Sequence, residues 1–236
     1  MKKLILSLAL VCASTNFFAQ NADPVQLLNE GKTALEAKNY QQAFTKFKTY
    51  LTQTNNQDSV IAYNCGVCAD KIKQPADALK YFDIAVQKKY NLDNAYIGKA
   101  GALKDLKKNE EYVATLKEGL EANPDNKTLT RMYATHFVNQ GIIAQKGQKM
   151  SAAEDAFKQA IAIQPENINA LNSLGTLYYS KGATTLKTDA EKAKVEFKEA
   201  KGYLEKLMPS LSADKPAHKR MLDNAKTMLN FINSQL

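Results

Sequence analysis

The sequence predicts an all-α fold built from repeated helix pairs, and three observations indicate it. Only 10 glycines and 6 prolines occur among 236 residues, about 7% together against about 12% in average proteins. So few turn-forming residues disfavour a many-stranded sandwich or barrel and favour helices joined by short turns. Apolar residues make up 44% of the chain, which excludes a wholly disordered chain. One residue pattern also recurs about every 34 residues, as expected of stacked helix pairs.

The recurring pattern is a small residue, an alanine twelve positions later and an aromatic residue four positions beyond the alanine. Gly31 and Gly66 are 35 residues apart, and Gly141 and Gly175 are 34 apart. We expect two antiparallel helices per unit, in which the small residues let the backbones approach and the ring fills the space beside them. The copies are Gly31, Ala43 and Phe47; Gly66, Ala78 and Phe82; Gly141, Ala153 and Phe157; and a degraded one at Ala100, Tyr112 and Leu116.

Cap and turn residues predict where the helices begin. Pro24 follows Asp23 and opens the first helix, and Pro75 opens the second helix of the second unit. Ser151, with Glu154 three residues later, predicts a capping box at the second helix of the fourth unit. The predicted units are 24–57, 59–92, 93–126, 134–167 and 168–208, and extra residues before Gly141 and within the last unit stretch two of the spacings.

Residues 215–235 are predicted to form an amphipathic helix that caps the open end of the stack. Its apolar residues recur at helical spacing, which indicates one packed face. They are Met221, Ala225, Met228, Leu229 and Ile232, with Lys219, Arg220 and Lys226 expected on the opposite face.

Residues 1–19 have the pattern of a secretory signal peptide. Lys2 and Lys3 precede an almost unbroken apolar run from Leu4 to Ala13, and Ala19 is the expected cleavage point. The run is about half the length that a membrane-spanning helix needs, so no integral membrane segment is expected. Its basic start and Ala-Gln end resemble signals of the Bacteroidota. We therefore expect an exported protein, in the periplasm, at the cell surface or secreted.

Residues 24–208 resemble a tetratricopeptide-repeat protein. The best matches are Leu171, Leu174, Gly175 and Tyr178 in one helix, and Ala153, Phe157, Ala160 and Pro165 in another. The chain departs from the family pattern in having no Trp and in carrying the usual first-helix tyrosine only as Tyr178. The resemblance implies a right-handed superhelix of antiparallel helix pairs. It also implies a binding surface on the concave side, formed by the first helix of each pair.

Carrying the family register across the units gives a candidate partner-binding face. Its mixture of aliphatic, tyrosine, lysine and asparagine side chains suits a peptide or helix better than a small ion. The family's carboxylate-clamp pattern is absent, because only Asn64 matches one of its positions. The candidate residues are Leu28, Lys32, Tyr63, Val67, Ile97, Lys104, Ile142, Asn172 and Tyr179, with Leu35, Asp70, Val138 and Thr176 beside them.

The sequence contains little material for catalysis or metal binding. Cys65 and Cys68 have the spacing of a redox pair, but the repeat register places both at packed positions within a helix, where cysteine acts as a small hydrophobe. His136 and His218 lie in different units, and a zinc site needs about four ligands. We therefore expect no catalytic residue, metal or cofactor. Without residues 1–19, which carry Lys2 and Lys3, the net charge falls from +8 to +6. This charge is expected to be spread over mixed clusters, and with the secretory signal this argues against a nucleic-acid partner.

These observations predict a non-catalytic protein–protein interaction scaffold of the bacterial cell envelope, which binds a peptide or a partner protein in its concave groove. Two alternatives stay open. One is a periplasmic binding or accessory protein for a peptide or a glycan, and the other is a thiol–disulfide redox protein that uses Cys65 and Cys68.

Overall fold

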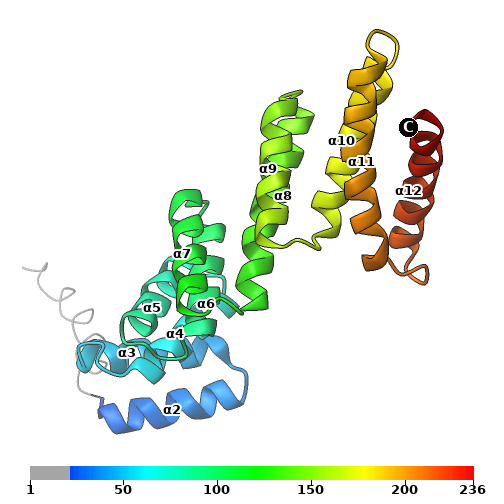
Figure 1. The fold of residues 1–236 in the computed structure, drawn as a ribbon. Helices are drawn as coiled ribbons and strands as arrows, with labels where there is room; N and C mark the ends of the chain where they lie inside the picture. Colours follow the sequence, from blue (N-terminus) through cyan, green and yellow to red (C-terminus); the bar gives the residue numbers. More distant parts are fainter. Residues whose placement is uncertain (1–21) are drawn as a thin grey trace, which may run out of the picture. The chain divides into compact units, whose positions relative to one another are not determined.

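The computed structural model describes residues 22–236, and this range consists of eleven α-helices and one short 3-10 helix, with no β-strand (Figure 1). The predicted all-α fold is confirmed for this range. The predicted signal peptide at residues 1–19 lies outside the described residues. Within them, no helix combines the length and the apolar character that crossing a membrane requires.

The described helices form two compact units, divided between Asn126 and Lys127. Within each unit, helices that follow one another in the chain pack against each other. The first unit contains α2 (Pro24–Glu36), α3 (Tyr40–Gln53), α4 (Ser59–Lys71), α5 (Pro75–Gln87), α6 (Leu92–Asp105) and α7 (Asn109–Ala122). The second contains α8 (Lys127–Lys146), α9 (Met150–Ile163), α10 (Ile168–Thr185), α11 (Ala190–Leu207), the 3-10 helix η1 (Met208–Ser210) and α12 (Pro216–Gln235).

Glycines on first helices face aromatic rings from the second helices in the core. A Cβ atom added to Gly31 of α2 would lie 2.5 Å from Cε1 of Phe47 in α3, and one added to Gly141 of α8 would lie 2.5 Å from Cε1 of Phe157 in α9. No side chain fits at such a distance, so each pair packs this closely because the glycine has none. Both rings are completely buried. The predicted pairing of a small residue with a ring is confirmed at these two positions.

The turn inside four of the helix pairs repeats one backbone geometry. In each, the residue after the helix cap has a left-handed φ, and the residue after that donates its N–H to a carbonyl five positions back, as Asn39 does to Ala34. This is the Schellman arrangement, which satisfies carbonyls at a helix end and usually employs glycine. None of the four is glycine: they are Lys38, Lys73, Lys107 and Gln148, with φ values of 57°, 60°, 60° and 58°.

A side chain caps several helices, but not where the capping box is predicted. At the start of α4, Asp58 accepts a hydrogen bond of 3.0 Å from the backbone N–H of Ile61. Helix α9 begins at Met150, so Ser151 lies inside its first turn and no side chain caps this helix. The predicted box at Ser151 is wrong. A cap at Ser151 would make Ala152 the first helical residue, but the helix begins two residues earlier. Glu154 bonds instead to Lys158 of its own helix and to Tyr178 and Lys181 of α10.

The extra residues of the stretched units form additional helical turns. Helix α8 has 20 residues and begins seven positions before the unit boundary predicted at 134. Helices α10 and α11 have 18 residues each, whereas α2 to α7 and α9 have 13 or 14. Helix α12 packs on this longer pair and buries Ala225 and Ile232 there. The long last pair, α10 and α11, therefore forms the surface on which the predicted capping helix packs.

Candidate functional site

Three of the six candidate residues in the first unit pack against its own core. Leu28, Tyr63 and Val67 are partly buried and contact the core formed by α2 to α5. The ring centroid of Tyr63 lies 5.8 Å from those of Phe82 and Tyr90, and burial raises the pKa of Tyr63 above its ordinary value. Of the remaining candidates in this unit, Ile97 is half-buried, and Lys32 and Lys104 are exposed on α2 and α6.

In the second unit, Asn172 and Tyr179 lie on one face of α10 and line a groove between α10 and α12. Thr176, which the register placed beside them, lines the groove between them and is exposed. Ile142 is 37% exposed on α8 but is not part of this groove. The structure therefore brings two of the nine candidates together, while the other seven are distributed over α2, α4, α6 and α8.

This α10–α12 groove is open to solvent and has a volume of about 540 Å³. Its α10 residues are four and three positions apart, so they form a single row along the helix. Those of α12 follow the same helical spacing and form the facing row. The lining residues are Asn172, Thr176 and Tyr179 from α10, and Arg220, Met221, Asn224, Thr227 and Met228 from α12.

One end of the α10–α12 groove is aromatic. The ring centroid of Tyr179 lies 5.7 Å from that of Phe231 on α12 and 6.2 Å from that of Phe197 on α11. Phe197 and Phe231 are themselves 5.8 Å apart with their planes nearly perpendicular. Phe197 is fully buried and Phe231 is 37% exposed. The two phenylalanine rings hold Tyr179 in place by packing against it.

The groove has opposite character at its two ends. Helices α10 and α12 are each antiparallel to α11 and therefore run in the same direction (Figure 1). Asn172 and Arg220, which come early in their helices, mark one end, and Tyr179 and Met228, which come later, mark the other. The groove thus leads from a cationic and amide-bearing end to an aromatic and apolar end.

The position of Arg220 differs from the prediction, which places it on the face opposite Met221. Helix α12 is fully buried only at Ala225 and Ile232, so its packed stripe is narrow and Arg220 and Met221 both border the groove. The α12 side of the site is not predicted from the repeat pattern. The spacing of Arg220, Asn224 and Thr227, at intervals of four and three, is the signal that could have indicated a common face.

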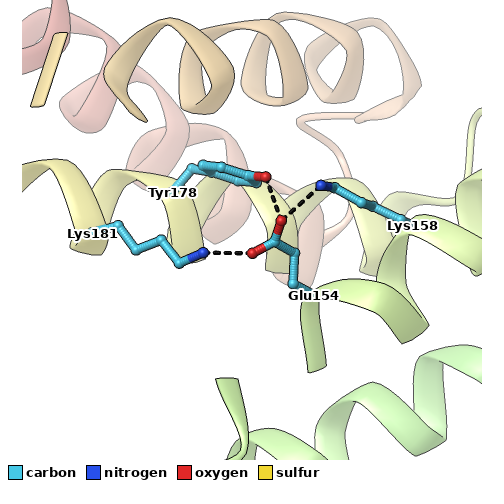
Figure 2. Close-up of polar contacts among 4 residues, drawn as sticks. All are labelled: Glu154, Lys158, Tyr178 and Lys181. Atoms are coloured by element: carbon cyan, nitrogen blue, oxygen red, sulfur yellow. Dashed lines mark hydrogen bonds and ion pairs between the residues drawn. The ribbon is translucent and has the colours of Figure 1, made fainter. Parts of the chain in front are cut away.

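A second polar cluster joins α9 to α10 (Figure 2). Glu154 accepts hydrogen bonds from Tyr178 and from the two lysines, Lys158 and Lys181. Both ammonium groups also lie near the Tyr178 ring, with Nζ 5.5 Å and 4.9 Å from its centroid. Burial alone would raise the pKa of Glu154, but these hydrogen bonds outweigh it and lower the pKa to about 2. Both lysines share the single carboxylate of Glu154, and the contacts join α9 to α10, which assigns the cluster to helix–helix packing.

Cys65 and Cys68 are fully buried in the middle of α4 and are unpaired, as the packing interpretation predicts. Burial raises the pKa of the Cys65 thiol far above its ordinary range and that of Cys68 to about 11. Since the thiolate is the reactive form, this environment suppresses disulfide exchange. A redox thiol would be exposed and would have a lowered pKa, so the structure lends no support to the redox alternative.

The two histidines take part in local contacts. His136 Nε2 lies 2.9 Å from Nε2 of Gln140 on α8, and the ring Nδ1 of His218 accepts a hydrogen bond of 3.2 Å from the backbone N–H of Ser212. In residues 22–236, no three histidine, cysteine or acidic side chains are grouped as metal ligands would be.

Solved structures of other proteins share this architecture. No family model and no curated protein matches the chain. Among solved structures, a TPR-repeat protein from Bacteroides fragilis is 45% identical and superposes with a TM-score of 0.68, over 88% of this chain and 100% of that one. YrrB, described as a TPR protein with an unusual peptide-binding site, is 16% identical with a TM-score of 0.51, over 91% of this chain and 98% of that one. The likeness to YrrB concerns the fold alone.

Proposed function

This chain belongs to the tetratricopeptide-repeat family, and from that premise we propose that it is a non-catalytic interaction protein that binds a segment of a partner protein in the α10–α12 groove. Stacked helix pairs present preformed surfaces on which peptides and helices dock. A preformed surface loses little conformational entropy on binding, which favours a recognition role.

The α10–α12 groove is the single observation that carries this proposal. It combines amide and hydroxyl groups, which can bond to a peptide backbone, with Tyr179 and two methionines, which can contact apolar side chains. Met side chains adapt to different partner shapes, and Tyr179 is held by its ring contacts. Such a lining suits a peptide segment, and YrrB, a protein of the same fold, is described as having an unusual peptide-binding site.

The proposal is tested with a variant whose side chain fills the α10–α12 groove. In the variant Thr176→Trp, a bulky ring on the exposed side of α10 should block the groove without disturbing the core, because Thr176 is exposed. Proteins retained by the immobilised mature chain from envelope extracts of the source bacterium should be lost with this variant. The matched control is Lys226→Glu, an exposed residue on α12 outside the groove, which should retain them.

Equal retention by the wild-type chain and the Thr176→Trp variant would show that partners bind elsewhere. Circular dichroism of both variants verifies that helix content and melting are unchanged, so that any loss is attributed to the groove.

The proposed site of action is the cell envelope, reached by export through residues 1–19. The support is the order of a basic start, an apolar run and a small residue at Ala19. A partner in the same compartment would then meet the folded chain after secretion.

Export predicts a mature chain that begins at Gln20. Full-length protein produced in a bacterial host should be recovered outside the cytoplasm, and intact mass measurement should show the loss of residues 1–19. The variant Leu8→Arg interrupts the apolar run and should leave an uncleaved chain in the cytoplasm. Recovery of the wild-type chain as uncleaved cytoplasmic protein would contradict the export proposal and would leave the groove proposal intact.

A further inference from the structure

The two units of the mature chain differ in charge. Residues 127–236 contain sixteen lysines and arginines against ten aspartates and glutamates, whereas residues 20–126 contain fourteen of each. The whole positive excess of the mature sequence therefore lies on the second unit, the one that carries the α10–α12 groove. A positive surface attracts acidic partners and raises their rate of encounter.

Arg220 brings this charge into the groove. It is the single charged residue among the groove-lining side chains, and no carboxylate in residues 22–236 pairs with it. Lys215 and Lys219 stand beside it at the start of α12, and both are exposed. An unpaired guanidinium is suited to a carboxylate, because its planar fork matches the two carboxylate oxygens.

The other lining residues indicate which further polar and apolar groups a bound segment must carry. Asn172 and Asn224 provide amide donors and acceptors near the Arg220 end, as a peptide backbone requires. Tyr179 and Met228 provide an apolar surface at the other end. From Arg220 to Met228, α12 rises about 12 Å, which an extended peptide covers in about three to four residues.

We propose that the α10–α12 groove binds a short extended segment of a partner protein in which an aspartate, a glutamate or a terminal carboxylate lies about three residues from an aromatic or large aliphatic side chain. The carboxylate pairs with Arg220, and the apolar side chain packs on Tyr179 and Met228. This inference rests on the proposed function and adds the chemistry of the partner. A nucleic acid would require a row of cations along the groove, whereas the groove is lined by one arginine and seven uncharged residues.

Random seven-residue peptides displayed on phage test the inference. They are selected on the immobilised mature chain, and the enriched peptides are synthesised with a fluorophore and titrated by anisotropy. We expect enrichment of peptides with an acidic residue about three positions from an aromatic or aliphatic one. Their affinity should fall about 10- to 100-fold in Arg220→Glu, as expected for the loss of a charge-assisted hydrogen bond, and should weaken as salt rises from 50 to 500 mM.

Lys226→Glu is the matched control, because it changes the net charge equally on an exposed α12 residue outside the groove. It should leave the affinity within about twofold. Enriched peptides that lack acidic residues, or acidic peptides bound equally by Arg220→Glu, would overturn the inference. If such peptides are still lost with Thr176→Trp, the groove function stands. Peptides indifferent to Thr176→Trp, or no enrichment at all, would count against both proposals.

Discussion

Replacement of Phe157 by alanine is expected to lower the free energy of unfolding by about 3–5 kcal/mol, the usual loss for a large buried ring. Phe157 is completely buried between α8 and α9, where it fills the space left by Gly141. Urea denaturation of residues 20–236, followed by circular dichroism, measures the loss. Because the chain has two compact units, hydrogen exchange of peptides from α8 and α9 should show that the second unit opens first.

The matched control is Val195→Ala on α11, where the side chain is 62% exposed. It removes apolar atoms from the same unit but should change the free energy of unfolding by less than about 0.5 kcal/mol. Similar losses for Phe157→Ala and Val195→Ala would contradict the packing described for α8 and α9.

Because Gly141 contacts Phe157, we expect Gly141→Ala to destabilise the wild-type chain but to stabilise the Phe157→Ala variant. In the wild-type chain, Gly141→Ala places a Cβ atom 2.5 Å from the ring, and such overpacking costs about 1–3 kcal/mol. In the Phe157→Ala background the ring is gone, so the same change should stabilise the chain by up to about 1 kcal/mol through helix propensity. A double-mutant cycle measures both effects. A destabilising Gly141→Ala in both backgrounds would show that the ring is not what requires glycine.

Glu154 is expected to make the second unit sensitive to acid. Its pKa is lowered from 4.5 to about 2 in the folded chain by Lys158, Lys181 and Tyr178. A carboxylate with a lowered pKa stabilises the folded state fully above its unfolded pKa, and this stability is lost as the pH falls from about 4.5 to about 2. The full shift corresponds to about 3 kcal/mol, and solvent around the exposed Lys158 reduces the expected effect to about 1–2 kcal/mol. The same contacts raise the pKa of Lys158, so the two shifts describe one interaction.

Glu154→Gln keeps the shape of the side chain and removes its charge. At pH 7 it should reduce the free energy of unfolding by about 1–2 kcal/mol, and it should flatten the loss of stability below pH 4.5. Denaturation curves between pH 2 and 7 measure both effects. Glu191→Gln is the control, because its side chain is 85% exposed and pairs only with Lys194 at the helix surface. A wild-type pH profile that Glu154→Gln leaves unchanged would exclude this carboxylate as the cause.

The parts of this structure that repeat could be predicted, and those that arise between unlike elements could not. Gly141 and Phe157 recur at the spacing of other pairs, so their contact follows from the period. The burial of Cys65 follows from the same register. Repeated positions are constrained in the same way in each unit, and this redundancy makes them visible in one sequence.

The contacts of Arg220 and Glu154 could not be predicted from the repeat pattern. Arg220 lies in the capping helix, which has no counterpart in the repeats, and whether it faces a groove depends on how α12 sits on α10 and α11. Glu154 has the spacing of a capping box, but Tyr178 and Lys181 lie more than twenty residues away in the chain. A local sequence pattern predicts hydrogen bonds to residues nearby in the chain. In the folded chain, tertiary packing also brings residues of other helices within bonding distance, and the side chain can bond to those instead.

Substitutions in the four Schellman turns can change the stability of one helix pair at a time. Lys38, Lys73, Lys107 and Gln148 hold left-handed conformations that glycine would adopt without steric cost, so each turn keeps a local steric penalty of about 1–2 kcal/mol. Because a helix pair contacts only its neighbours, relief of one penalty stiffens one pair and leaves distant pairs as they are. Evolution can therefore adjust the rigidity of individual pairs through single surface codons, without altering a core residue or a binding side chain.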